Sequence, residues 1–181
     1  KILNSKNSKN DEINWHFHPK SIRSNPIANA TSYNNSIKEI TNIISKRIIE
    51  DNWFPVVNRP GFHAIRPDSH LFLEQWIPYD YANQYYETKN DQKDLDHGRF
   101  GDWTRASKTW IGYNPSIHDY QIKGGCRRKI FRCLNVGTRH KILKKKHVNQ
   151  AFNDANKYNK AILCIVNHDY RDMTDDVLNT M

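Results

Sequence analysis

The stretch from Ser36 to Asn58 reads SIKEITNIISKRIIEDNWFPVVN, and it contains the pattern that decides the fold. Ser36 and Glu39 form a capping box, in which each side chain accepts a hydrogen bond from an otherwise unpaired backbone N–H of the first turn. Apolar residues then recur at helical spacing, at Ile37, Ile40, Ile44 and Ile48. This spacing predicts an amphipathic helix over 36–51, and the apolar run FPVVN at 54–58 predicts a short buried strand after it.

Segments on both sides of this stretch extend the pattern. The run AILCIV at 161–166 follows an apolar helical face at 148–157, and six consecutive apolar residues are typical of a strand buried in a parallel sheet. A further helix is expected at 126–135, where Cys126 and Cys133 would share one face. The alternation of strands and helices predicts an α/β fold with helix 36–51 packed outside one mostly parallel sheet. Its neighbouring strands are expected at 13–17, 54–58, 76–80 and 161–166.

The composition favours one packed domain. Of the 181 residues 37% are hydrophobic and 12% aromatic, which is more ring surface than a disordered chain carries. We interpret residues 1–181 as a single α/β domain of catalytic type, cut from a longer protein at both ends. No apolar run reaches the roughly 18 residues of a membrane-spanning helix, so no membrane span is expected.

The charge is unevenly distributed. The formal net charge is +9, and residues 123–146 contain ten basic residues and no acidic one. A basic stretch can bind nucleic acid, but this one has neither a zinc-finger spacing nor an RNP-like string. We therefore expect no nucleic-acid partner and a solvated outer face, with Ile130, Phe131 and Leu134 turned inward.

The cysteines do not form a recognisable framework. There are three, and their spacing fits neither a set of disulfides nor a paired zinc site. We expect all three, Cys126, Cys133 and Cys164, to be small buried hydrophobic residues.

Polar residues that could perform chemistry follow the predicted strands, where α/β proteins place their functional groups. His16 and His18 are two apart, so in a strand both point to one side and could share a metal ion. Arg59 follows the strand at 54–58 and can hold a carboxylate through a bidentate pair. Ordinary surface histidines and a loop arginine before a Pro-Gly turn would explain the same residues.

A third cluster, Asn167-His168-Asp169-Tyr170-Arg171, follows the strand at 161–166. His168 at the end of a buried strand can act as a general acid or base, with Asp169 or Arg171 tuning its pKa. The structural alternative is that Asn167 or Asp169 caps a following helix.

In their order along the chain, these clusters resemble the polysaccharide deacetylase family, the chitooligosaccharide-deacetylase homology group. His18-Pro19 resembles the end of the second motif of that family, Arg59-Pro60-Gly61-Phe62 the third, and Val166-Asn167-His168 the fifth. The likeness covers most of residues 13–172. It implies an irregular, incomplete (β/α) barrel and metal-assisted hydrolysis that removes N-acetyl groups from amino sugars or a polysaccharide.

The chain departs from the family pattern in four motifs. The paired histidines of the family are four apart, whereas His16 and His18 are two apart. The third motif reads RPGF, where the family usually has Arg-x-Pro-aromatic-Gly. The fourth motif is represented by Asp102-Trp103 or by Asp80. The Asp-rich first motif is expected upstream of Lys1.

The resemblance also implies a role for each matching residue. A divalent metal ion, typically zinc, would be held by His16, His18 and an aspartate of the first motif. Arg59 would orient the catalytic aspartate, and His168 would protonate the departing amine. The residues expected to contact the substrate, some by stacking of their rings on sugars, are Phe62, His63, Trp76, Tyr79, Asp80, Trp103, Asp169 and Arg171.

Two other functions remain open. A barrel could bind a saccharide without hydrolysing it, because the spacing of the two histidines departs from the family. A nucleic-acid-binding protein could use residues 123–146. The deacetylase hypothesis predicts that His16, His18, Arg59 and His168 converge at one end of the sheet, since the ends of parallel strands meet at one rim.

Overall fold

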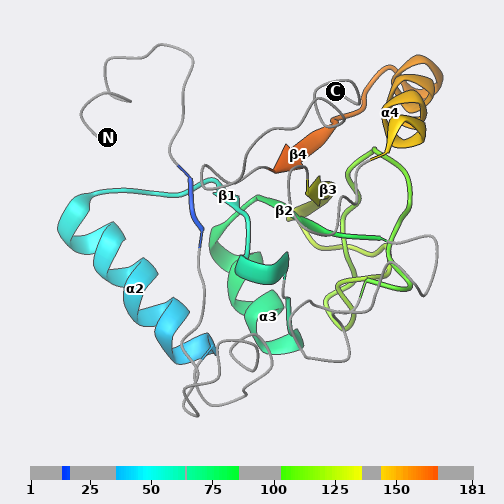
Figure 1. Ribbon diagram of the computed structural model, residues 1–181. Coiled ribbons are helices and arrows are strands. Elements are labelled where there is room, and N and C mark those ends of the chain that lie inside the picture. Colours follow the sequence, from blue (N-terminus) through cyan, green and yellow to red (C-terminus); the bar gives the residue numbers. More distant parts are fainter. Residues whose placement is uncertain (1–13, 17–35, 64, 86–102, 136–143, 167–181) are drawn as a thin grey trace.

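Parallel strand pairing organises the fold in the computed structural model, which describes residues 14–16, 36–63, 65–85, 103–135 and 144–166. One sheet contains the strands β1 (Val57–Asn58), β2 (Tyr79–Asn83), β3 (Lys129–Asn135) and β4 (Cys164–Val166), in that order. Each neighbouring pair is parallel, and the sheet curls into half a barrel (Figure 1). The predicted α/β class, with mostly parallel strands in an incomplete barrel, is therefore confirmed.

Helix α2 (Ser36–Asp51) has the predicted bounds and lies beside helix α3 (Pro67–Trp76) (Figure 1). The apolar side chains between them form one core cluster, which contains Trp15, Ile40, Ile44, Phe72, Leu73 and Ile77. Trp15 also forms an isolated parallel bridge with Asn58, so the chain around Trp15 runs along β1. Burial of this shared apolar face holds α2 against α3 and against the edge of the sheet.

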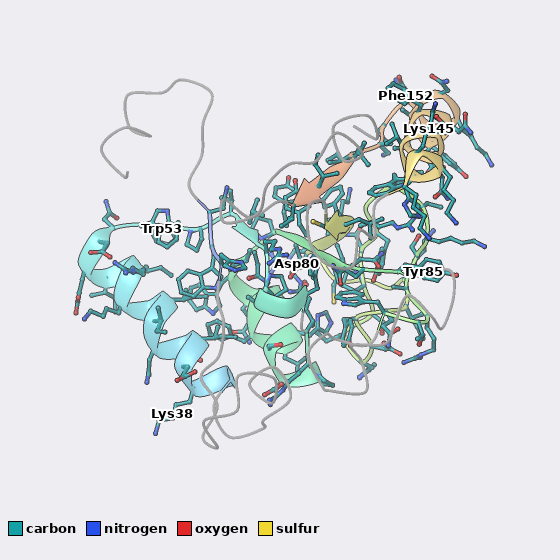
Figure 2. All side chains as sticks on the ribbon, in the orientation of Figure 1. Lys38, Trp53, Asp80, Tyr85, Lys145 and Phe152 are labelled. Carbon is teal, nitrogen blue, oxygen red and sulfur yellow. The ribbon has the colours of Figure 1, made fainter. Side chains whose placement is uncertain are left out.

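Helix α4 (Lys145–Tyr158) packs at the other edge of the sheet. Its Ala151 joins a cluster with Trp110 and with Leu134 of β3. Phe152, predicted on the apolar face of this helix, is instead exposed to solvent (Figure 2). The buried contacts of α4 with this cluster are therefore made by Ala151 and by His147, whose ring lies edge to face with that of Trp110.

Three predicted strands are present in shorter or shifted form. The strand expected at 54–58 is limited to Val57–Asn58, and the one expected at 161–166 to Cys164–Val166. The strand expected from Trp76 begins at Tyr79, because residues 67–76 form α3. This helix, which begins with Pro67 in its first turn, was not predicted.

The helix predicted at 126–135 is wrong, because Lys129–Asn135 is strand β3 at the centre of the sheet. Arg128 and Arg132 are four apart and resemble the polar face of a helix, yet both are buried. In a strand, residues 128, 130, 132 and 134 share one face. The helical spacing of Cys126 and Cys133 was therefore misleading. Arg128 is buried beside Asp80, and Arg132 is buried beside Trp110 and Gln150.

The expectation of a fully solvated basic face also needs correction. Ile130, Phe131 and Leu134 are buried as predicted. Arg132, however, is 1% exposed, and its Nη1 donates to the backbone oxygen of Lys108 at 2.7 Å. Its guanidinium lies 4.8 Å from the ring centroid of Trp110. Within the described part of the stretch, the lysines and Arg127 form the outer face, whereas Arg128 and Arg132 belong to the core.

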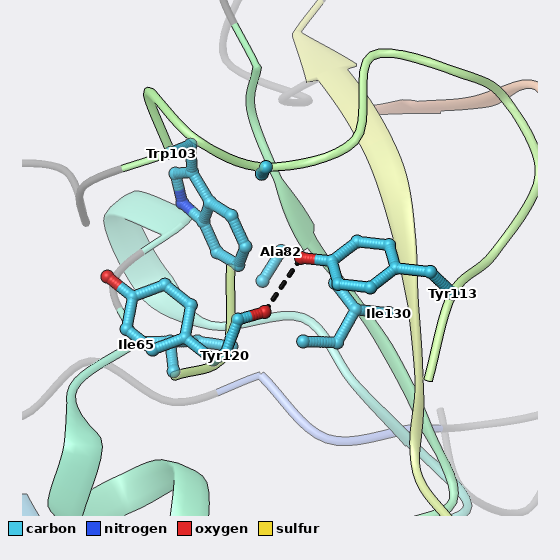
Figure 3. Close-up of a cluster of buried hydrophobic side chains, with 7 residues drawn as sticks. Ile65, Ala82, Trp103, Tyr113, Tyr120 and Ile130 are labelled. Carbon is cyan, nitrogen blue, oxygen red and sulfur yellow. Dashed lines mark hydrogen bonds between the residues drawn. The ribbon is translucent and has the colours of Figure 1, made fainter. Parts of the chain in front are cut away.

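The segment 103–124 forms a third cluster against β2 and β3 (Figure 3). Trp103 and Tyr120 meet with their ring centroids 5.0 Å apart, edge to face. The hydroxyl of Tyr113 donates to the backbone oxygen of Tyr120 at 2.8 Å. These contacts fold the segment back on itself, so it covers one face of the sheet in place of a helix.

No helix in the described ranges is long and apolar enough to cross a membrane.

The backbone of Gly124 passes close to the backbone of Ser116, and this close approach allows a test of the packing. The backbone N–H of Gly124 donates to Asn114 O at 2.8 Å, and a Cβ at position 124 would lie 2.4 Å from Ser116 Cα. Because backbone atoms cannot yield as a flexible side chain does, Gly124→Ala should lower the free energy of unfolding by about 1–3 kcal/mol. Urea unfolding measures this loss.

The matched control is Gly125→Ala, because a Cβ at position 125 would meet nothing within 4 Å. This neighbouring variant should have the stability of the parent chain. Equal losses of unfolding free energy in both variants would contradict the close approach of Gly124 to Ser116.

Candidate functional site

The two faces of the sheet carry different polar groups. Register pairs Asn58 with Asp80 and Asp80 with Ile130, so these three side chains share one face. Helix α3 lies on that face, since its His70 contacts Arg128. Cys133 is three positions after Ile130 and therefore points to the opposite face, as does its registered partner Cys164.

Arg59 belongs to the same face as the two cysteines. It directly follows Asn58, so its side chain points away from α3. The Arg59 guanidinium acts electrostatically on both thiols, although they lie on β3 and β4: it favours the ionised form of each cysteine. The curl of the sheet thus brings the end of β1 towards β4.

His63 holds the Arg59 guanidinium in place. Nη2 of Arg59 lies 2.7 Å from Nε2 of His63. An arginine only donates, so this ring nitrogen accepts. His63 ends the 3₁₀ turn η2 (Gly61–His63) at a φ of +50° and is fully buried. Arg59 is therefore fixed by an imidazole from the turn that follows its own strand. We call Arg59, His63, Cys133 and Cys164, together with His16, the rim cluster.

His16 joins the rim cluster through the backbone. Trp15 N donates to Val57 O, and Arg59 N donates to Trp15 O, each at 3.0 Å, so the chain at 15–16 is paired to the end of β1. His16 Nδ1 then lies 2.6 Å from the carbonyl oxygen of Arg59. A carbonyl only accepts, so Nδ1 carries the proton and, in the neutral ring, Nε2 is the unprotonated nitrogen. The His16 side chain is exposed.

The two thiols of the rim cluster are in contact. Their Sγ atoms lie 3.3 Å apart, and both cysteines are free. The hydrogen bond between the two thiols, helped by Arg59, lowers the pKa of Cys164. The same hydrogen bond and burial raise the pKa of Cys133 well above its usual value. Cys164 is therefore the more readily ionised of the two thiols.

A second polar cluster lies on the face towards α3 and is formed by Asn58, His70, Asp80 and Arg128. Arg128 Nη1 donates to Asp80 Oδ2 at 3.0 Å, and the amide of Asn58 donates to the same oxygen at 2.9 Å. Arg128 also contacts His70 Nδ1. Both charged side chains are 0% exposed. We call this group the buried ion-pair cluster.

Burial sets the protonation of the buried ion-pair cluster. Burial raises the pKa of Asp80 to about 6, whereas Arg128 and Asn58 lower it. Burial and the neighbouring Arg128 lower the pKa of His70, so its ring is held neutral. The cluster combines one cation with one carboxylate that retains its proton more readily than usual.

The predicted site residues divide between these places. His16, Arg59 and His63 are brought together in the rim cluster. Asp80 lies on the other face in the buried ion-pair cluster. Trp103 is 1% exposed and donates from Nε1 to the backbone oxygen of His63 at 2.8 Å, so it supports the 3₁₀ turn from inside the core.

The remaining predicted residues are exposed or lie outside the described residues. Trp76, the last residue of α3, and Tyr79, the first residue of β2, are exposed. They lie at the amino-terminal end of the strands, whereas Arg59 follows the carboxyl end of β1. Phe62 lies in the turn η2, and only the backbone of this residue is described. His18, His168, Asp169 and Arg171 lie outside the described residues. In the described ranges no three His, Cys, Asp or Glu side chains are grouped to hold a metal.

Sequence reasoning missed the thiol pair and the buried ion-pair cluster. Cys133 and Cys164 are 31 positions apart, and Asp80 and Arg128 are 48 apart. Both contacts depend on the register between strands, for which these residues carry no local signal. Comparison of the chain with protein-family models, curated proteins and solved structures found no match.

The buried ion-pair cluster predicts a pH-dependent cost for Arg128→Met. Asp80 has a folded pKa of about 6, above the usual 3.8, so it contributes stability that is fully present below about pH 4 and lost as the pH rises through 6. Without Arg128 the folded pKa rises further and this loss deepens. The variant should lose about 3–5 kcal/mol of unfolding free energy at pH 7, and clearly less at pH 5.

Arg127→Met is the matched control, because its side chain is exposed and its backbone N–H makes the hydrogen bond to Glu74. It should change stability by no more than about 0.5 kcal/mol at either pH. Urea unfolding at the two pH values measures both variants. A cost for Arg128→Met that is the same at pH 5 and pH 7 would exclude the coupling with Asp80.

Proposed function

We propose that this chain is a metal-dependent hydrolase that removes N-acetyl groups from amino sugars or from a polysaccharide. The observation that carries the proposal is the 2.6 Å contact between His16 Nδ1 and the Arg59 carbonyl. It joins a predicted metal ligand to a predicted positioning residue at the carboxyl end of β1. Barrel enzymes gather their functional groups at this end of the sheet.

The state of His16 fits a metal ligand. A ligating histidine usually donates its second ring N–H to a carbonyl or carboxylate, which fixes the tautomer and the ring orientation. Nδ1 of His16 makes such a bond, the ring is exposed, and unprotonated Nε2 is the type of atom that ligates zinc. His18 and an aspartate from the first motif of the family would complete the ligand set. When bound, the ion would supply Lewis acidity that polarises the acetamide carbonyl.

The other residues would orient groups and move protons. Arg59, held by His63, would orient the catalytic carboxylate that takes a proton from the attacking water. His168 would donate a proton to the amine nitrogen as the C–N bond breaks. The products would be acetate and a free amino sugar. Trp76 and Tyr79, both partly exposed, offer rings on which a longer saccharide could stack.

Those exposed rings also favour the second candidate, a barrel that binds a saccharide without hydrolysing it. A nucleic-acid partner has less support, because Arg128 and Arg132 of the basic stretch are buried and cannot contact phosphates.

Zinc binding tests the role of His16. In the full-length protein, His16→Ala should lower zinc affinity at least about 10-fold, because it removes a proposed zinc ligand together with the hydrogen bond that orients its ring. The control is His118→Ala, which removes another exposed histidine. Isothermal titration calorimetry gives both affinities. If His16→Ala binds zinc as tightly as His118→Ala does, His16 is not a ligand.

Turnover tests the roles of the two other histidines. In the full-length protein, His168→Ala should retain the metal and lose roughly 10²–10⁴-fold in turnover, since it removes the general acid. His18→Ala should lose the metal as well. The measurement is acetate release from an N-acetylated amino-sugar oligomer, with metal content determined in parallel. A protein that binds the oligomer with zinc present but releases no acetate would be the carbohydrate-binding barrel instead.

A further inference from the structure

The thiols of Cys133 and Cys164 form an unexplained reactive pair. They are registered partners on the adjacent parallel strands β3 and β4, and their Sγ atoms lie 3.3 Å apart. Both are free, and Cys133 is fully buried whereas Cys164 is partly exposed. Neither thiol has a role in the proposed hydrolysis.

Strand geometry permits a covalent link between them. Neighbouring strands are about 4.7–4.9 Å apart, which falls within the Cα separation of about 4.4–6.8 Å found in disulfides. The sulfur atoms would have to approach from 3.3 Å to about 2.05 Å. Two side chains on one face of the sheet can make this movement by rotation about their Cα–Cβ bonds, with a small shift of the strands.

The surroundings favour reaction at Cys164. A thiolate is the reactive form of cysteine, and a neighbouring cation and a hydrogen-bond donor both stabilise it. Arg59 and the Cys133 thiol supply these two influences and lower the pKa of Cys164. Partial exposure gives a small oxidant access to Cys164, and the buried Cys133 is in position to resolve the product.

We propose that Cys133 and Cys164 form a reversible dithiol site that reacts with hydroperoxides. The Cys164 thiolate attacks one oxygen of the peroxide, the O–O bond breaks, and Cys164 becomes a sulfenic acid while hydroxide or alkoxide leaves. The Cys133 thiol then attacks the Cys164 sulfur, and its proton leaves with the hydroxyl group as water. The two thiols have lost two electrons to the peroxide, and a dithiol reductant restores them by exchange.

The pair differs from a structural disulfide in its setting. The strand spacing of about 4.7–4.9 Å is shorter than the most common Cα separation of disulfides, about 5.5–6 Å, and strained or exposed disulfides are the more easily reduced ones. Closure would also remove the thiolate beside Arg59. The dithiol chemistry requires neither metal nor saccharide, so it can be tested apart from the proposed hydrolase function, although both would use Arg59.

Thiol counting in the full chain tests the proposal. Reduced protein is treated with hydrogen peroxide, denatured and titrated for thiols. Two of the three thiols should be lost, with a mass decrease of about 2 Da and a cross-linked peptide that joins Cys133 to Cys164. Dithiothreitol should restore all of them. If both thiols persist in folded protein, or if the new disulfides join separate chains, the proposal fails.

Single variants locate the reactive sulfur. Cys133→Ser should stop at the sulfenic acid on Cys164, which a dimedone-type probe labels. Cys164→Ser should lose thiols much more slowly, and the control Cys126→Ser should form the same bond as the parent. If the serine variants do not fold, limited alkylation of native parent protein with iodoacetamide should label Cys164 first. Preferential labelling of Cys126 would contradict the assignment.

Discussion

The burial of Arg128 constrains much of the rest of the fold. A charged side chain that is fully buried requires a partner, because desolvation without one costs several kcal/mol. The partner is Asp80 on β2, which also accepts a hydrogen bond from Asn58 on β1, while His70 of α3 contacts the same guanidinium. Residues from β1, from β2, from the position directly before β3 and from α3 therefore meet at one ion pair. A shift of one residue in β2 would turn Asp80 to the opposite face and leave Arg128 unpaired, so the pair selects a single register.

The sequence predicted the elements whose stability is local and missed those that depend on distant partners. Helix α2 follows from the repeated isoleucines, and Cys164–Val166 falls inside the apolar run that predicted a strand. Strand β3 was mistaken for a helix because Cys126 and Cys133 are seven apart, which places them on one face of a helix. The segment instead buries Arg128 and Arg132. Their burial depends on Asp80 and on Trp110 with Gln150, which are far away in sequence. Arg59 could be found because it directly follows a predicted strand. The thiol pair could not, because the register of β3 against β4 is a property of the folded sheet.

The curl of the sheet turns a row of short strands into a shared site. In a flat sheet β1 and β4 would be three strand spacings apart, about 14 Å, which is farther than an arginine side chain extends. Yet the Arg59 guanidinium lowers the pKa of Cys164 on β4. The strands must therefore bend round so that the side chains opposite α3 approach one another. The helices and the segment 103–124 occupy the outer face, where the apolar clusters and the ion pair stabilise the sheet.

Arg59 links the two parts of the rim cluster through different atoms. Its backbone carbonyl accepts from His16 and sets the tautomer of that ring. Its guanidinium contacts His63 and stabilises the thiolate of Cys164. Because the carbonyl position is fixed by the pairing of β1 with the chain at Trp15, the orientation of His16 does not depend on what the guanidinium contacts. A change at the thiols therefore acts on the charge presented by Arg59, whereas the ring that would hold a metal ion is oriented by the sheet itself.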